Sequence, residues 1–188
     1  MKRWLAFTII PVFIVLGFVQ EMVKVNVNYY LEQTSSVPGF YNGTNEQRKQ
    51  WMEDHRIDAP FDYYYSHRPI DWLHHLSLGQ LSKLKWGLAV FFIGIHFTLN
   101  VLFLRLYFRA SEEKQRKQAK RFLPMLYIVS FVLAGIFLVG GKLIGMDVPS
   151  YNISRKILGF MQSPMPAILL ILLIPLAARF EEQRKVES

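Results

Sequence analysis

Cysteine is absent from this chain of 188 residues, and so are several motifs that would reveal a chemistry. Without cysteine there can be no disulfide, no thiolate nucleophile and no cysteine-ligated metal. The sequence also contains no HExxH zinc motif, no GxSxG nucleophile motif and no phosphate-binding P-loop. Acidic residues are missing from the long apolar runs, which disfavours a small transporter.

What the sequence does have is four long uncharged runs, at residues 4–20, 86–104, 122–141 and 157–178. A helix rises about 1.5 Å per residue, so roughly 20 residues cross a hydrocarbon core of about 30 Å. The first run lacks a small-x-small cleavage site, which favours an uncleaved anchor over a signal peptide. We therefore predict an all-α, polytopic membrane protein forming a single membrane domain over residues 1–188. Its four transmembrane helices are expected at residues 4–23, 86–108, 122–144 and 158–179.

The net charge of +8 is unevenly distributed along the chain. If both termini are cytoplasmic, the cytoplasmic segments include the stretch RASEEKQRKQAKR and hold nearly all of the basic excess. This is the pattern of the positive-inside rule. We expect a cytoplasmic loop at 109–121 that touches anionic lipid headgroups, and an extracytoplasmic segment at 24–85. Because the basic residues flank helix ends, the lipid bilayer is the expected partner and nucleic acid is not.

The extracytoplasmic segment is expected to be partly helical. Its first part is polar and contains the turn signals Pro38-Gly39 and Asn42-Gly43. The stretch NEQRKQWMEDHRI then predicts a short amphipathic helix with Thr44 or Asn45 as its N-cap. The segment has too little apolar material to predict a core of its own, so we expect it to lie over the helix ends.

The stretch HRPIDWLHHL concentrates polar residues before the second run. Proline favours the first helical position and pushes the preceding residue out of the helical region. We therefore expect a helix from Pro69 that excludes His67 and leads into the second span. Asp71, His74 and His75 then share one side of its first turns at spacings of three and four residues.

Three interpretations of this stretch remain open. Its polar residues bind headgroups or a partner at the membrane interface, with Trp72 at headgroup level. Alternatively, they form a metal site if His55 or His67 folds back, or they perform acid–base chemistry. No zinc signature supports the metal site, so we predict no metal and no cofactor.

Two further polar groups lie where apolar residues are expected. His96 and Asn100 fall on one side of the second predicted span, four residues apart. Polar side chains at such depth face the interior of a helix bundle, either as a functional pair or as interhelical hydrogen-bonding groups.

The stretch YNISRKILGFMQSPMP interrupts the fourth run. Pro164 and Pro166 disfavour a continuous helix, so we expect a short outer helix, a break, and the true span from about Met165. Arg155 precedes the break and is a candidate for binding a lipid phosphate or a carboxylate, and Gln162 enters the apolar run beside it. The alternative is an ordinary hairpin with interfacial charges.

The layout resembles a family of small four-span membrane proteins, the exosortase F system-associated proteins of Bacteroidetes. The resemblance rests on HFTLNVLFLRLYFR in the second span and SRKILGFMQSPMPAILLILLIP in the last. It implies a multi-pass protein of the bacterial inner membrane with an accessory role. The chain does not resemble the exosortase itself, a Cys-Arg-His transpeptidase, because it has no cysteine.

Two functions follow from these observations. The first is a non-catalytic accessory or assembly subunit of an inner-membrane complex, with other membrane subunits as partners, in protein export or surface anchoring. The alternative is an enzyme acting on a lipid or lipid-linked substrate at the outer interface. Its catalytic candidates are His67, Asp71, His74 and His75. The candidates for lipid or partner binding are Arg68, Trp72, Arg155 and Gln162.

Overall fold

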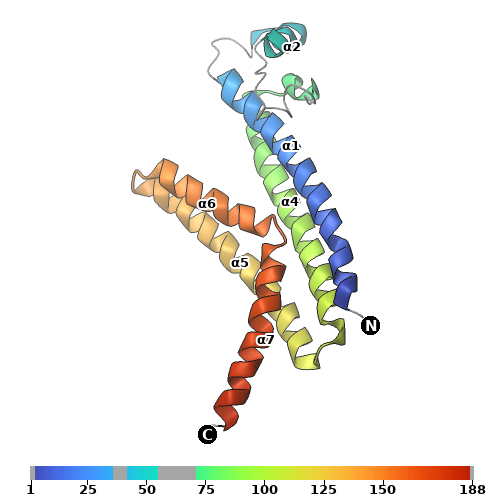
Figure 1. Ribbon diagram of the computed structural model, residues 1–188. Helices are drawn as coiled ribbons and strands as arrows, with labels where there is room; N and C mark the ends of the chain where they lie inside the picture. The colour runs from blue at the N-terminus through green and yellow to red at the C-terminus, as the bar shows by residue number, and fades with distance from the viewer. Residues whose placement is uncertain (1–2, 36–41, 55–70, 187–188) are drawn as a thin grey trace. The chain divides into compact units, whose positions relative to one another are not determined.

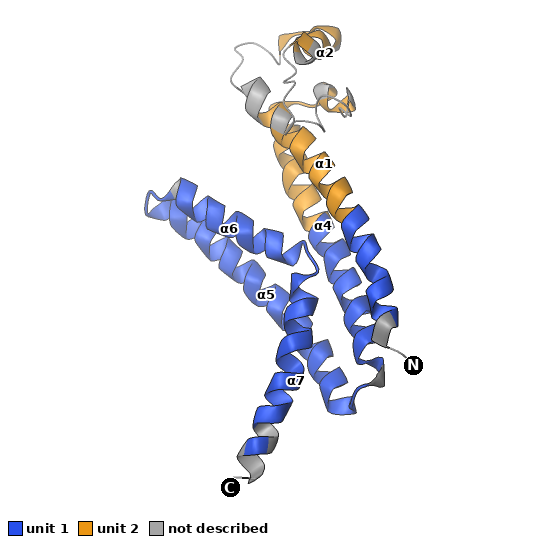
Figure 2. Cartoon of the chain, in the orientation of Figure 1, with its two compact units in different colours: residues 1–15, 92–188 blue, residues 16–91 orange. Residues whose placement is uncertain are grey.

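The computed structural model describes residues 3–35, 42–54 and 71–186, and this part of the chain is all-helical, with no strand. Three of its helices are long and apolar enough to cross a membrane, and a fourth span arises if a bent helix pair is counted as one. These apolar helices are compatible with a multi-pass membrane protein. The chain falls into two compact units, residues 1–15 with 92–188 and residues 16–91 (Figures 1 and 2).

In the unit of residues 16–91, helix α1 extends further than the sequence suggested. It runs over Ile10–Ser35, so residues 24–35 of the expected extracytoplasmic segment continue the helix. Val23, Val27 and Leu31 recur every four residues and make an apolar stripe along this extension. Packing of this stripe overrides the polar composition of its sequence.

A small core belongs to this unit. Val27, Tyr30, Leu73 and Leu81 are buried together, with Trp51 of helix α2 (Asn45–Asp54) packed against them. The expectation that the segment lacks a core of its own is therefore wrong. It treated residues 24–85 as polar, and missed that the ends of α1 and α4 (Leu78–Tyr107) within this segment bring its few apolar side chains together.

Two capping boxes set helix starts in this unit. The Thr44 amide donates to Gln47 Oε1 at 2.8 Å and the Gln47 amide to Thr44 Oγ1 at 3.3 Å, which confirms Thr44 as the N-cap of α2. Ser77 and Gln80 repeat this exchange at the same distances, 2.8 and 3.3 Å. The continuous helix predicted from Pro69 is thus wrong, because helix α4 (Leu78–Tyr107) starts only after Ser77.

In the other unit, α4 is joined to helix α5 by a short turn. The turn includes a 3₁₀ segment at Phe108–Ala110, and α5 spans Glu113–Leu143. The basic stretch predicted as a loop at 109–121 is therefore helical from Glu113. An ion pair between Lys117 Nζ and Glu113 Oε1 at 2.7 Å, one turn apart, favours this helical start.

Helix α6 (Asp147–Met161) folds back along α5 (Figure 1). Gly145, with φ of 71°, supplies the left-handed residue of the turn. The two helices approach so closely that a Cβ on Gly141 would overlap the side chain of Ser150. Ser154 Oγ donates to the Ala134 carbonyl at 3.0 Å. The missing side chain of Gly141 thus allows the close contact, and the hydrogen bond from Ser154 stabilises it.

Helix α7 (Met165–Val186) follows α6 after a break and is bent from it by 72°. The predicted break, with a new helix from Met165, is confirmed. The fourth span, expected as one helix over 158–179, is not continuous, because its first residues end α6 and residues 162–164 form the break.

Candidate functional site

The most polar place inside the apolar helices of the unit of residues 1–15 and 92–188 is the break between α6 and α7. A helix leaves its last carbonyls without intrahelical partners, and an apolar environment offers no water to replace them. The end of α6 therefore needs donors from elsewhere in the chain.

Asn100 of α4 supplies one of these donors. Its side chain is fully buried, and Asn100 Nδ2 donates to the Ser163 carbonyl and to the Tyr127 hydroxyl, each at 2.9 Å. The expected interhelical hydrogen bonding is thus present at Asn100. The position on α4 follows from the sequence, whereas its partners do not.

Tyr127 of α5 supplies the second donor. Its hydroxyl donates to the Met161 carbonyl at 2.8 Å while it accepts the bond from Asn100. The ring packs edge-on against Phe97, with centroids 4.9 Å apart. The hydroxyl thus joins α4, α5 and the end of α6.

Ser163 completes the arrangement within the break. Its hydroxyl donates to the Phe160 carbonyl at 2.7 Å and accepts from the Met165 amide at 3.2 Å. Three carbonyls at the end of α6 or in the break therefore have side-chain donors, from three different elements. The arrangement holds a backbone conformation, and it contains no carboxylate or thiol. Within the described part of the chain, Asn100 Oδ1 accepts no hydrogen bond although it is buried.

His96 lies one turn before Asn100 and is also buried, with 2% of its surface exposed. The ring of Phe13, from α1, stacks on its imidazole with centroids 5.7 Å apart and an interplanar angle of 22°. His96 and Asn100 thus line the interior of the bundle, as their spacing predicts. They contact different elements, Phe13 on one side and Tyr127 on the other.

The polar stretch before α4 is placed differently from the expectation. Asp71–His75 forms a short 3₁₀ helix, in which Trp72 is exposed and Leu73 is buried. His75 is exposed as well. The predicted candidates His67 and Arg68 lie outside the described residues.

Arg155 and Gln162 are not brought into one binding site. Arg155 is exposed on α6, whereas Gln162 is buried where the helix ends, about 10 Å further along its axis. Asp71, His74 and His75 belong to the unit of residues 16–91, and Arg155 to the other. Among the described residues, no group of three or more His, Cys, Asp or Glu side chains is placed to hold a metal ion.

Sequence reasoning missed Tyr127 and the role of Ser163. A signal for both was present, because a predicted break at Pro164 implies carbonyls that need donors, and Tyr127 interrupts an apolar run.

The chain matches no family model, no curated protein and no solved structure in the comparisons made.

Proposed function

We propose that the chain is a non-catalytic accessory or assembly subunit of a bacterial inner-membrane complex. The observation that carries the proposal is the use of the buried polar groups at the α6–α7 break. Asn100, Tyr127 and Ser163 bond to backbone carbonyls, and so they stabilise a shape rather than present reactive groups. Buried polar groups that stabilise a fixed backbone shape suit a subunit on which other proteins assemble.

The surface of α5 supports this proposal. Its buried residues lie on one narrow stripe: Ala119, Leu123, Tyr127, Ser130, Ala134 and Gly141. Large apolar side chains such as Ile128, Phe131 and Ile136 are more than half exposed elsewhere around the helix. Its own chain therefore covers one side of α5, and the rest is available to lipid and to neighbouring subunits.

The resemblance to exosortase F system-associated proteins supplies the context, which is protein export or surface anchoring. In this proposal both termini are cytoplasmic, because that orientation places the basic excess inside. The proposed partner is another integral membrane subunit that packs on the exposed side of α5.

The absence of cysteine makes a direct test simple, because each introduced cysteine is the single one in the chain. The test compares Ile136→Cys on α5 with Phe18→Cys on α1, because the two side chains have similar exposed fractions, 59% and 61%. Each would carry a photoactivatable maleimide in native membranes. We expect Ile136→Cys to give a heterologous adduct of one fixed mass, and Phe18→Cys to give adducts with lipid alone.

Purification in mild detergent provides the second measurement. We expect the chain to co-elute at constant stoichiometry with the subunit identified in the adduct. A strictly monomeric chain, with only lipid adducts at Ile136→Cys, would contradict the proposal. If replacing both His74 and His75 with alanine abolished a cellular activity while the assembly stayed intact, the enzyme alternative would replace it.

A further inference from the structure

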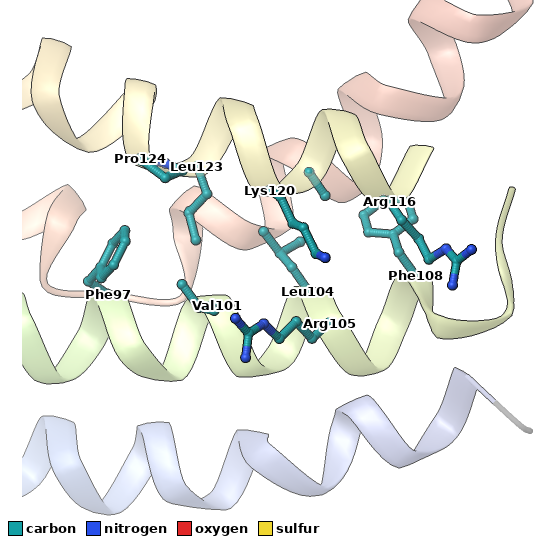
Figure 3. Close-up of a pocket in the computed structure, with 10 residues that line it drawn as sticks. Phe97, Val101, Leu104, Arg105, Phe108, Arg116, Lys120, Leu123 and Pro124 are labelled. Carbon is teal, nitrogen blue, oxygen red and sulfur yellow. The ribbon is translucent and has the colours of Figure 1, made fainter. Parts of the chain in front are cut away.

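A second feature lies between α4 and α5. It is a partly open pocket of about 400 Å³, within the size range of small-ligand sites (Figure 3). Apolar side chains make up most of its wall, and three basic residues complete it. The lining residues used below are Phe97, Val101, Arg105, Arg116, Lys120 and Pro124.

The spacing of these residues explains the layout of the pocket. On α4, Phe97, Val101 and Arg105 recur every four residues, so they lie along one side of the helix. On α5, Arg116, Lys120 and Pro124 do the same. Each stripe extends about 12 Å.

The two helices run in opposite directions on either side of a short turn. The order along α4 is apolar to basic, and the order along α5 is basic to apolar. The antiparallel hairpin therefore places Phe97 and Pro124 at one end of the pocket and Arg116 at the other, with Arg105 and Lys120 between them (Figure 3). The pocket has a cationic end and an apolar end.

The positive charges at the cationic end of the pocket lack carboxylate partners within the described part of the chain: none forms an ion pair with Arg105, Arg116 or Lys120. Lys117, on a different side of α5, is by contrast paired with Glu113 at 2.7 Å. The three side chains are exposed and of one charge, so they attract an anion to this end of the pocket.

We propose that this pocket binds an anionic phospholipid, with its phosphate among Arg105, Arg116 and Lys120 and an acyl chain along Phe97 and Val101. Arginine and lysine are the side chains that hold phosphate oxygens, and basic pockets between membrane helices bind anionic headgroups. The apolar run of α5 begins at Phe122, just beyond Lys120, so the cationic end lies at the headgroup level of a membrane. A soluble phosphate would leave the apolar wall unused, and this selects a lipid.

The test uses the purified full-length chain and native mass spectrometry. The probes are phosphatidylglycerol and phosphatidylcholine with identical acyl chains. We expect one retained phosphatidylglycerol per chain, bound at least tenfold more tightly than phosphatidylcholine. The triple variant R105Q/R116Q/K120Q should lose this preference.

A matched control separates the pocket from general charge. The variant R109Q/K117Q/R121Q also removes three positive charges, but from positions that do not line the pocket. It should keep the preference for phosphatidylglycerol. Loss of the preference in both variants would show nonspecific charge attraction and overturn the proposal. Equal binding of the two lipids by the unmodified chain would overturn it as well.

Further measurements test the apolar end of the pocket, distinguish a lipid from a free phosphate, and guard against misfolding of the triple variant. Val101→Trp should weaken phosphatidylglycerol binding about tenfold, because the indole fills the space of the acyl chain. Millimolar glycerol 3-phosphate should not displace the lipid, and displacement would reassign the site to free phosphate. If circular dichroism shows that the triple variant is unfolded, Lys120→Gln against Lys117→Gln carries the same comparison.

Discussion

Two of the junctions between helical segments leave backbone groups without partners, and they solve this problem in different ways. At the start of α4, Ser77 and Gln80 satisfy each other's backbone amides within a single exposed turn. At the break between α6 and α7, the donors come from Asn100 of α4 and Tyr127 of α5. The first junction is local, and the second depends on three helices.

The difference follows from what surrounds each junction. Water can replace a lost bond at an exposed helix end, so a cap there adds only about 0.5–1 kcal/mol. A buried carbonyl has no such substitute, and leaving it without a donor costs about 1–3 kcal/mol. The break therefore couples the positions of α4, α5 and α6, whereas the Ser77 junction couples nothing beyond its own turn.

The largest effect is expected for Asn100→Leu. The change removes two hydrogen bonds and leaves the partly buried Ser163 carbonyl without this donor, so we expect a loss of about 3 kcal/mol in unfolding free energy. Unfolding in mixed detergent micelles, followed by circular dichroism, measures it. Thr98→Val is the control, because its exposed hydroxyl bonds only the Gly94 carbonyl in its own helix. Equal stability of the two variants would refute the proposed role of Asn100.

Gly141→Ala is expected to cost about 2 kcal/mol, because the new methyl group overlaps the Ser150 side chain and separates α6 from α5. Gly135→Ala on the same helix meets nothing within 4 Å, and it should be neutral or slightly stabilising. The same unfolding measurement distinguishes them. If the Gly141→Ala variant unfolded with the same free energy as the unmodified chain, the break would not depend on the position of α6.

Tyr127→Phe removes one hydroxyl and keeps the ring against Phe97, so a loss of about 1 kcal/mol is expected. Combined with Asn100→Leu in a double-mutant cycle, the losses should not add, because both residues serve one network. Additive losses would show that the two hydrogen bonds act independently.

Ser77→Ala is expected to have the smallest effect, about 0.5 kcal/mol, and confined to the first turn of α4. Hydrogen exchange should increase at residues 78–81 and remain unchanged at residues 158–165. Ser82→Ala, at an exposed position of α4 outside the capping box, provides the baseline. Faster exchange at the distant break would contradict the local character of this junction.

Sequence patterns predicted much of this arrangement where the cause is local. Uncharged runs predicted the long helices, the stretch from Asn45 predicted α2 with Thr44 or Asn45 as its N-cap, and Pro164 predicted the break. The extension of α1 to Ser35 was missed because it depends on packing against residues far along the chain. The role of Tyr127 was missed for the same reason, since one sequence does not show which helix supplies a donor to another.

The 72° bend between α6 and α7 has a consequence for the bilayer. Because α6 lies along α5, α5 and α7 point in directions separated by nearly the same angle, and one tilt cannot make both perpendicular to a membrane. If they share it equally, each leans by about 36°, close to the upper end of tilts seen in membrane helices. The 31 residues of α5 then project over about 37 Å and the 22 residues of α7 over about 27 Å, against a core of about 30 Å. Upright, α5 would exceed the hydrocarbon core by about 16 Å and α7 by about 3 Å, so sharing the inclination removes most of the excess of α5 and leaves α7 only about 3 Å short.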